Sequence, residues 1–257
     1  MKIEPPKAEK IPFKHEIHGD VRIDNYYWLN ERDNDKVIDY LNNENSYTDK
    51  ILKPTQKLQD ELFQEMKSRI KEDDTSVPYY YNEYWYMRKY EKGKDYPVYL
   101  RKYKSLDADE ELLVDVNELA KGYSYFQLRG ISISPDNKKM AYAVDTLSRR
   151  IYTIKIKNLE TGEMYNEQIK NTTGGSTWAN DNKTLFYSSR EDVTLRVNKV
   201  HKHKLGSDTS MDELVYEEKD KEFSTGVYKT KSNKFLVIGS GSTLTLSLIH
   251  ISEPTRL

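Results

Sequence analysis

Within the first 75 residues, after a proline-rich start, the apolar and polar positions follow the period of an α-helix in two stretches. From Asp35 to Leu52 the apolar side chains fall mainly on one side of such a helix. Pro54 then permits a new start, because proline is tolerated in the first turn of a helix. The next apolar side chains at helical spacing are Leu58, Leu62, Phe63, Met66 and Ile70. This stripe predicts a second, amphipathic helix that packs on a partner surface.

After residue 75 the period shortens to that of β-strands. Two strand-like runs, Val77–Tyr81 and Tyr84–Tyr90, flank a turn at residues 82–83. A third run, Tyr96–Leu100, follows a glycine-containing turn. Tyrosine is the dominant aromatic residue, with 21 in the chain. Its ring packs on a sheet while its hydroxyl stays in contact with solvent, which suits many short strands with narrow layers between them.

A turn followed by an apolar strand occurs three times in the rest of the chain. The copies are Ser134–Ala143, Ala179–Ser188 and a looser Lys231–Ile238. Their turn asparagines, 45 and then 51 residues apart, are Asn137, Asn182 and Asn233. A period in this range, with several short strands per unit, is typical of propeller blades. A β-sandwich whose hairpins have similar spacing is the alternative that this weak repeat leaves open.

Composition narrows the class of protein without identifying a ligand. The 257 residues are 36% hydrophobic and 32% charged, with a net charge of −1. The net charge therefore gives no reason to expect nucleic acid or an anionic membrane as a partner. The absence of cysteine excludes disulfides, thiolate zinc sites and a cysteine nucleophile. No run is apolar enough for a signal peptide or a membrane span, so we expect a soluble cytoplasmic protein without cofactor or metal.

Particular residues near the start resemble the prolyl oligopeptidase family. That family has a conspicuous Asp-x-Tyr-x-Trp-Leu element followed by a Tyr-Leu-x-x-Glu-Asn segment. The matching residues here are Asp24, Tyr26, Trp28 and Leu29, and then residues 40–45. Within the family, the stretches similar to the oligopeptidase B branch are residues 65–78, 113–120 and 215–220. The resemblance extends collinearly from about Ile11 to about Thr245.

The resemblance implies a mainly β fold with two parts present and one part missing. Residues 1–74 would form an N-terminal helical arm, and residues 75–245 about three to four blades of a roughly seven-bladed β-propeller. In the family, a C-terminal α/β-hydrolase domain with a Ser-Asp-His triad completes the protein, and here it is absent. The arm packs on that domain in the family, which gives the apolar stripe a partner. We expect a hinge at the crossing from arm to propeller, formed by Asp73, Asp74, Thr75 and Ser76.

The resemblance also implies an activity. Members of the oligopeptidase B branch are serine endopeptidases that hydrolyse short peptides after Arg or Lys, and the propeller restricts entry to the active site. Short basic peptides and the missing hydrolase domain are therefore the expected partners, with the activated serine forming an acyl-enzyme. Two alternatives stay open. One is a non-catalytic propeller that binds a protein or peptide, and the other is the prolyl endopeptidase branch of the same family.

This chain by itself contains no catalytic residue that we can name. Its sequence has no Gly-x-Ser-x-Gly elbow, and we interpret the glycine-rich segments 174–178 and 239–242 as turns between strands. The triad is expected beyond residue 257, so we predict an isolated chain that is inactive and prone to association. The segment 246–257 looks like a translated sequencing-adapter tail, with a divergent native strand as the alternative. His250 is therefore not offered as a triad histidine.

The remaining candidates point only weakly to a site. His201 and His203 would lie on one face of a strand and could share a metal, but no Asp or Glu at matching spacing completes the ligand set. A solvated strand face is the interpretation that we prefer. The acidic run 217–222 could attract basic peptides, although charge runs are usually solvated turns. His15 and His18 are assigned to capping or surface roles.

Overall fold

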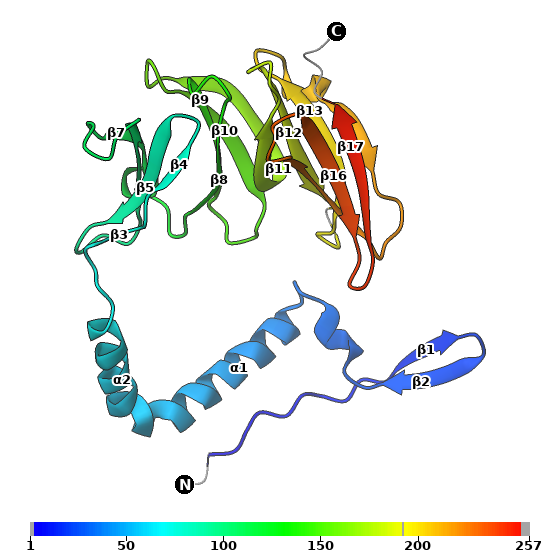
Figure 1. Cartoon of the computed structure of the whole chain (residues 1–257). Helices are drawn as coiled ribbons and strands as arrows, with labels where there is room; N and C mark the ends of the chain where they lie inside the picture. The colour runs from blue at the N-terminus through cyan, green and yellow to red at the C-terminus, as the bar shows by residue number, and fades with distance from the viewer. Residues whose placement is uncertain (1–2, 192, 253–257) are drawn as a thin grey trace. The chain divides into compact units, whose positions relative to one another are not determined.

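The computed structural model describes residues 3–191 and 193–252. Contacts between Cα atoms divide the chain into two compact units, with the boundary between Lys71 and Glu72. The first unit is a hairpin followed by two helices, and the second consists of antiparallel sheets (Figure 1). A mainly β chain with a helical arm, as predicted, is therefore confirmed.

The arm is built from short elements with capped ends. These elements are β1 (Phe13–Ile17), β2 (Asp20–Asp24), η1 (Tyr27–Asn30), α1 (Asp35–Leu52), η2 (Lys53–Thr55) and α2 (Gln56–Ser68). Asn34 caps α1, because its side-chain oxygen accepts a hydrogen bond from the backbone N–H of Lys36 at 2.9 Å. Pro54 lies in η2, between the two helices. The predicted helix 35–52 and the renewed helix after Pro54 are thus both confirmed.

The arm buries few side chains of its own. Trp28 and Val37 are its buried residues, and the Trp28 indole N–H donates to the carbonyl of Glu9 at 3.0 Å. Helix α2 buries none of its residues. The whole predicted stripe, from Leu58 to Ile70, is exposed. Helices in water are stabilised mainly by packing of an apolar face, so the exposed apolar face of α2 is suited to packing against a partner.

The second unit is a succession of antiparallel strands. The first sheet contains β3 (Asp74–Thr75), β4 (Tyr79–Tyr81), β5 (Tyr84–Tyr90), β6 (Val98–Tyr103) and β7 (Glu111–Asp115), and the short helix α3 (Val116–Leu119) follows it. The second sheet contains β8 (Gln127–Ile133), β9 (Lys139–Asp145), β10 (Tyr152–Asn158), β11 (Met164–Trp178), β12 (Thr184–Arg190), β13 (Val197–Lys204) and β14 (Glu213–Glu217), with η3 (Thr209–Met211) before β14. The third sheet contains β15 (Ser224–Lys229), β16 (Phe235–Gly241) and β17 (Leu246–Ser252).

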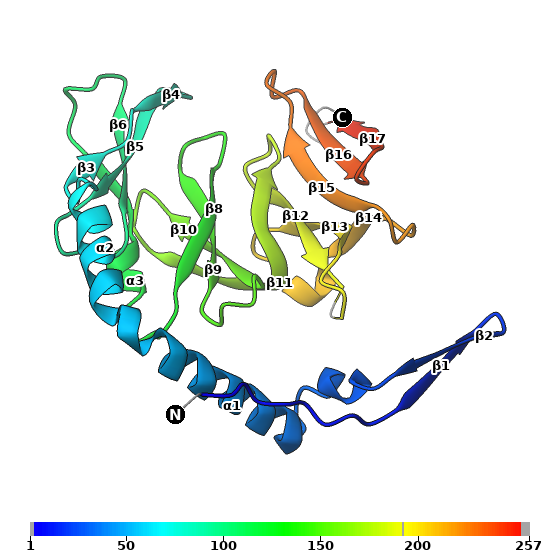
Figure 2. The ribbon, with the colours of Figure 1, turned by 90° about the horizontal axis from the view of Figure 1, so that it is seen from below.

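The long strand β11 belongs to two blades at once. Its first part, up to Thr172, pairs with β10, and its last part, Ser176–Trp178, pairs with β12. The register shifts between Thr172 and Ser176, so the strand bends there. The seven-stranded sheet is therefore two four-stranded blades that share β11, which is the outer strand of one blade and the inner strand of the next. Figure 2 shows the sheets of this unit following one another in an arc.

The second strand of each blade is buried on both faces. In β9, Met140 and Tyr142 pack toward the first blade, whereas Ala141 and Ala143 pack toward β11 and β12. In β12 and β16 the same alternation places Phe186 against Leu236 and Ile238. Side chains alternate between the faces of a strand, so a strand with neighbours on both sides is apolar at every position. This explains the apolar strands after each repeated turn and excludes a two-layer sandwich.

The end of the described chain forms a strand. Residues Leu246–Ser252 pair antiparallel with Phe235–Gly241. The segment predicted to be a non-native tail covers residues 246–257, and its last five residues, 253–257, lie outside the described residues. Its origin stays a prediction.

A candidate binding cavity on the inner strands

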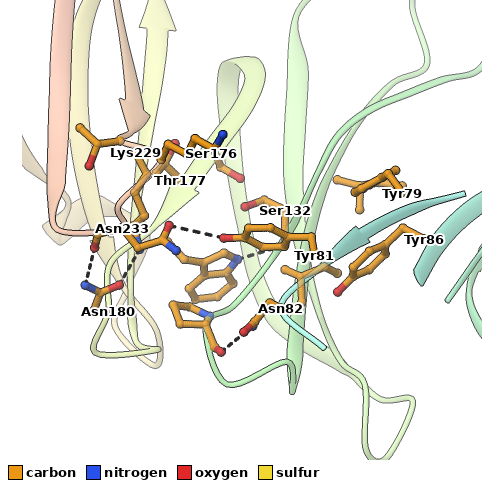
Figure 3. A pocket seen from close by; sticks show the side chains of 16 residues that line it. Tyr79, Tyr81, Asn82, Tyr86, Ser132, Ser176, Thr177, Asn180, Lys229 and Asn233 are labelled. Carbon is orange, nitrogen blue, oxygen red and sulfur yellow. Dashed lines mark hydrogen bonds between the residues drawn. The ribbon is translucent and has the colours of Figure 1, made fainter. Parts of the chain in front are cut away.

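A cavity of about 490 Å³ lies among the inner strands of successive blades. Its lining comes from β4, β5, β8, the end of β11, the end of β15 and turns beside these strands. Figure 3 shows Tyr79 and Tyr86 on one side of the cavity, and Lys229, Asn180 and Asn233 on the other. Its volume is in the range of about 300–1,000 Å³ that is common for small-ligand pockets.

The turns at the cavity have a repeated backbone geometry. Each contains an asparagine in the left-handed region, with φ values of 44° at Asn82, 61° at Asn137, 59° at Asn182 and 57° at Asn233. Asparagine tolerates this region better than other residues with a side chain. The predicted repeat at 137, 182 and 233 is thus present in the backbone, and Asn82 adds a fourth copy that the spacing did not reveal.

These asparagines also connect neighbouring blades. The Asn82 side-chain amide donates to Oδ1 of Asn137 at 2.9 Å, and Nδ2 of Asn137 donates back to the carbonyl of Asn82 at 3.0 Å. At the next junction, the backbone N–H of Asp136 donates to Oδ1 of Asn182 at 2.8 Å. The same residue therefore shapes the turn of its own blade and hydrogen-bonds to the adjacent blade.

At the third junction between blades, the side chain of Lys229 places a positive charge at the cavity. Nδ2 of Asn180 donates to the carbonyl of Asn233 at 2.8 Å, and Oδ1 of Asn180 accepts from Nζ of Lys229 at 2.8 Å. Lys231 lines the same cavity. Among the sixteen described residues that line it, these two lysines are the charged ones, and no carboxylate is present. The cavity therefore has a positive local charge in a chain whose net charge is close to zero.

Two hydroxyl groups in the lining are buried, and Oγ of Ser176 has no hydrogen-bond partner among the described residues. The other is the hydroxyl of Tyr86, whose side chain is 5% exposed. Burial raises the pKa of Tyr86 to about 12, against the opposing effect of the nearby Arg101 guanidinium. The phenol is therefore a neutral donor at physiological pH. Buried polar groups without a partner are uncommon, and in a cavity they mark positions where a ligand can hydrogen-bond.

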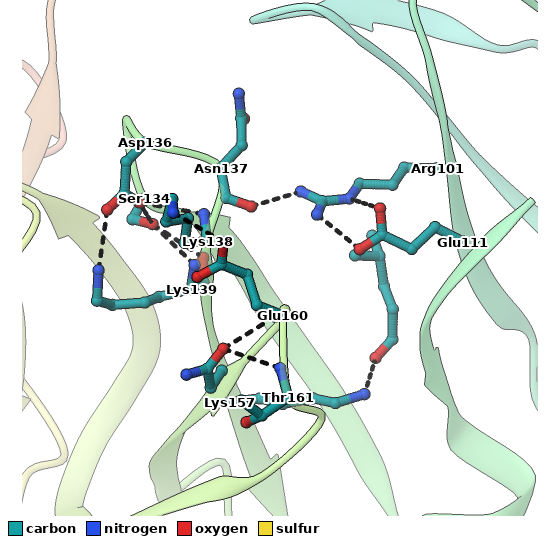
Figure 4. Close-up of polar contacts among 12 residues, drawn as sticks. Arg101, Glu111, Ser134, Asp136, Asn137, Lys138, Lys139, Lys157, Glu160 and Thr161 are labelled. Atoms are coloured by element: carbon teal, nitrogen blue, oxygen red, sulfur yellow. Dashed lines mark hydrogen bonds and ion pairs between the residues drawn. The ribbon is translucent and has the colours of Figure 1, made fainter.

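A buried arginine fixes the rim of the cavity to the first blade. Arg101 donates to both carboxylate oxygens of Glu111, at 2.8 and 2.6 Å, and to the carbonyl of Asn137 at 2.9 Å. Its guanidinium lies 4.0 Å from the ring centre of Tyr84. Figure 4 shows this contact between the first blade and the turn that carries Asn137. Bidentate pairing and stacking hold arginine in one geometry, so the turn has a rigid support.

The two central turns also contain carboxylates with lowered pKa values. Burial alone would raise the pKa of Asp136, but hydrogen bonds from Ser134 and Lys139 lower it below its ordinary value. At Asp181 burial is likewise outweighed by hydrogen bonds from the Thr184 hydroxyl and from the backbone N–H of Lys183. Both carboxylates are therefore structural acceptors that fasten the turn.

The histidines of β13 are not on a solvated strand face, and that interpretation is wrong. His203 is fully buried, and its Nδ1 lies 2.7 Å from Oδ1 of Asp212. The other oxygen of Asp212 accepts from the Tyr187 hydroxyl at 2.8 Å, which adds to burial in raising the pKa of that phenol. His201 lies 3.0 Å from Oγ of Ser189, and burial lowers its pKa. Asp212 follows η3, so only the fold brings it to His203.

No metal site forms at these histidines in the part of the chain that the structure describes. Within residues 3–191 and 193–252, no three side chains of the metal-binding types gather to hold an ion. His203 uses its Nδ1 for Asp212, and this pair with Tyr187 is a buried hydrogen-bonded group in the core of one blade.

The glycine-rich segments are strands, which corrects our interpretation of them as turns. Residues 174–178 lie in β11, and residues 239–241 lie in β16. Gly174 has a φ of 89° at the bend of β11. The sequence signal of several glycines is the same for a turn and for a bulged strand, because both need a conformation that glycine adopts freely.

The acidic run, residues 217–222, forms a loop around the guanidinium group of Arg196. Arg196 donates to the carbonyls of Asp220 and Phe223, at 2.6 and 2.7 Å, and to the carboxylate of Glu191 at 2.6 Å. The carboxylate of Glu218 accepts from the Tyr216 hydroxyl at 2.9 Å. These contacts give the run a structural use, and its predicted attraction for basic peptides stays a prediction.

The predicted hinge lies beside the first blade. Asp74 and Thr75 form β3, which pairs with Tyr90 and Lys89. The backbone N–H of Ser76 donates to the carbonyl of Arg88 at 2.9 Å. These residues are therefore attached to the second unit, and a hinge here stays a prediction, as do the domain boundaries at 74 and 245.

Residues 5–256 match the family described as "Prolyl oligopeptidase, N-terminal beta-propeller domain". The chain belongs to this family. The predicted resemblance and the propeller fold are thereby confirmed, because the match covers nearly the whole chain.

Several family members are similar to this prolyl oligopeptidase propeller over most of its length. Dipeptidyl aminopeptidase BI of Pseudoxanthomonas mexicana is 39% identical over 93% of the chain, and Protease 2 of Moraxella lacunata is 37% identical over 96%. Oligopeptidase B from Leishmania major superposes with a TM-score of 0.90 at 30% identity over 100% of the chain. The chain spans 36%, 37% and 38% of the lengths of these proteins. Its relatives are therefore peptidases that are much longer than the propeller chain.

Residues 3–191 and 193–252 contain no helix that is both long and apolar enough to cross a membrane.

Proposed function

We propose that this chain is the arm and propeller of a cytoplasmic serine oligopeptidase that hydrolyses short peptides after Arg or Lys. The observation that carries the proposal is the superposition on oligopeptidase B from Leishmania major, with a TM-score of 0.90 over the whole chain. The name of Protease 2 of Moraxella lacunata, 37% identical, supports a peptidase activity. In this proposal the catalytic serine belongs to a part of the protein outside these 257 residues.

The propeller would act as the gate of the active site. Its inner strands line a cavity, which supports a role in admitting small substrates. The exposed apolar stripe of α2 supports the hydrolase domain as the partner of the arm, because a helix with this stripe is stabilised by covering it. A gate of this kind excludes folded proteins by size and leaves the chemistry to the hydrolase domain.

Cleavage assays on the complete protein that contains this chain test the proposal. Peptides that differ only in Arg, Lys or Pro before the scissile bond should differ in kcat/KM, with Arg and Lys favoured over Pro by at least about 100-fold. A folded protein with exposed Arg residues should not be cleaved at all. Preference for Pro would move the chain to the prolyl endopeptidase branch. Absence of any cleavage would favour the non-catalytic binding propeller.

Release of dipeptides is a second candidate function. It is favoured by the name of the 39% identical relative, a dipeptidyl aminopeptidase. Such an enzyme needs the free amino terminus of its substrate, whereas an endopeptidase does not. Acetylation of the peptide amino terminus should therefore leave cleavage nearly unchanged under the leading proposal. Loss of cleavage on acetylation would support dipeptide release instead.

The 257-residue chain should be inert on its own. We expect no labelling by a fluorophosphonate that reacts with activated serines, because the sequence lacks a nucleophile elbow. The complete protein serves as the positive control. Labelling of the short chain at a serine would overturn the assignment of the triad to another part of the protein.

A further inference from the structure

We propose that the cavity on the inner strands binds the C-terminal carboxylate of a peptide. The proposal rests on the proposed peptidase function for its choice of ligand class. It concerns residues of the propeller itself, which no catalytic step uses. Lys229, Lys231 and the buried hydroxyl of Ser176 line the cavity, and Figure 3 shows Tyr86 across it from Lys229 and Ser176.

At the end of the cavity formed by β11 and β15, lysine and hydroxyl groups are available to bind an anion. The hydroxyl of Thr177 donates to the carbonyl of Val227 at 3.4 Å, so these two inner strands are adjacent. Ser176 on β11 and Lys229 on β15 both line this end of the cavity. Nζ of Lys229 is oriented by Oδ1 of Asn180 at 2.8 Å and brings a positive charge to it. Lys231 adds a second cation and forms no ion pair with a described residue.

The opposite side of the cavity suits the neutral part of a peptide. The Tyr86 hydroxyl is buried near the Arg101 guanidinium and stays protonated at physiological pH. It can donate to a peptide carbonyl or accept from a peptide N–H. The nearby rings of Tyr79 and Tyr81 and the side chain of Ile131 supply apolar contact. A peptide with its carboxylate at the lysines could therefore hydrogen-bond to Oγ of Ser176 and place its neutral part near the Tyr86 hydroxyl.

Charge decides between a carboxylate and a basic side chain as the bound group. The substrates proposed for the whole protein carry Arg or Lys, but the lining of this cavity contains two cations and no carboxylate to pair with a third. A basic side chain would be repelled there. The α-carboxylate is the one anion that every unblocked peptide has, so it fits this cavity irrespective of sequence. The consequence is a preference for peptides with a free C-terminus.

Titration of the 257-residue chain with short neutral peptides tests the site without any hydrolysis. The probe is N-acetyl-trialanine with a free carboxylate, compared with its C-terminal amide. The readout is the indole N–H resonance of Trp178, a cavity residue whose Nε1 donates to the carbonyl of Ser132 at 3.0 Å. The free acid should shift this resonance with at least about tenfold higher affinity than the amide. Equal affinities, or no shift with either peptide, would overturn the proposal.

Matched variants separate a built site from general electrostatics. Lys231→Gln should weaken binding of the free acid by about three- to tenfold. Lys234→Gln removes the same charge from the same turn outside the cavity lining, and it should leave the affinity unchanged. Tyr86→Phe should weaken the acid and the amide equally, because its hydroxyl faces the neutral part of the peptide. Equal effects of the two lysine substitutions would contradict the proposal.

A third peptide identifies which carboxylate is bound. N-acetyl-Ala-Glu-Ala-amide has a side-chain carboxylate and no free C-terminus. It should bind as weakly as the neutral amide, and binding equal to that of the free acid would overturn the assignment to the C-terminus. Since this titration involves no cleavage, its failure leaves the proposed peptidase activity intact, and failure of the cleavage assay leaves the titration valid.

Discussion

The turn asparagines combine two physical functions in one residue type. A residue in the left-handed region normally favours glycine, because a Cβ atom is strained there. Asparagine tolerates this conformation better than most residues, and its side-chain amide can hydrogen-bond to the next blade. Asn82 and Asn137 make such hydrogen bonds to each other. The rim of the cavity is thus held by side chains at the positions where the chain must turn.

Substitution of Asn137 should separate these two functions. Asn137→Gly keeps the backbone conformation but removes two hydrogen bonds between blades, so we expect unfolding to become easier by about 1–2 kcal/mol. Asn137→Ala should cost about 1 kcal/mol more, because alanine is strained at a φ of 61°. Urea denaturation measures both values.

Asn171→Gly is the control for the asparagine prediction. Asn171 has nearly the same φ, 57°, but among the described residues its side chain has no hydrogen bond to a neighbouring blade. This variant should therefore be nearly neutral. Equal losses for Asn137→Gly and Asn171→Gly would show that the amide contacts contribute nothing measurable.

The turn carboxylates predict a loss of stability in acid. The pKa values of Asp136 and Asp181 are lower in the folded chain than their ordinary value of 3.8. Each carboxylate therefore stabilises the fold fully above that value, from about pH 5, and the stabilisation is lost as the pH falls through the lowered folded pKa. The urea midpoint should fall between pH 5 and pH 3, and less steeply in the double variant Asp136→Asn/Asp181→Asn. Asp33→Asn, in the exposed start of the arm, should leave the slope unchanged.

Among the strands, β8 and β11 approach each other closely at two glycines, Gly130 and Gly174. A Cβ atom on Gly130 of β8 would lie 1.8 Å from the carbonyl oxygen of Gly174 in β11. No rotamer change relieves this overlap, because both sides are backbone. The close approach joins the inner strand of one blade to the bend where β11 passes into the next.

Gly130→Ala should therefore destabilise the chain strongly. We expect a loss of about 2–4 kcal/mol, from the strained φ of 67° together with the forced separation of β8 and β11. Gly122→Ala is the matched control, since Gly122 has a φ of 84° and nothing within 4 Å of the added Cβ. It should lose only about 1 kcal/mol. Equal losses in thermal or urea unfolding would contradict the argument from close approach.

At the scale of the whole chain, the arm exposes apolar surface that nothing in it covers. Phe63 and Met66 of α2 are 59% and 61% exposed. Surfaces of this kind drive association when their partner is missing. Phe63→Asp should therefore lower the weight-average mass in sedimentation toward that of a monomer, while the unfolding of the β unit stays unchanged.

Gln64→Asp is the control for this association. It introduces the same charge one residue away, at an exposed polar position of the same helix. It should leave the mass distribution as it is in the unsubstituted chain. If both variants dissociate the chain equally, charge repulsion rather than the apolar stripe controls association.

Much of the fold could be predicted because its signals are local. The helix at 35–52 follows from an apolar period and a capping asparagine, and the strands after each repeated turn follow from runs of apolar residues. The glycine-rich segments were misjudged for the same reason, since local composition does not distinguish a turn from a bulged strand such as β11.

The candidate site could not be predicted, because its parts come from five strands in blades that are distant in sequence. Tyr86, Ser176 and Lys231 lie in different blades, and no spacing rule links them. The burial of His203 and its pairing with Asp212 were missed likewise, because a β13 side chain meets a loop residue only after the blade has folded.

The order of helices and strands, the repeat of turn asparagines and the family can be predicted from the amino-acid sequence, since period, backbone preference and motif are properties of neighbouring residues. Which faces are buried, which blades exchange hydrogen bonds and which residues line the cavity depend on the folded arrangement of the blades. Those properties depend on distances between residues far apart in the chain, which packing of the blades fixes and local sequence does not contain.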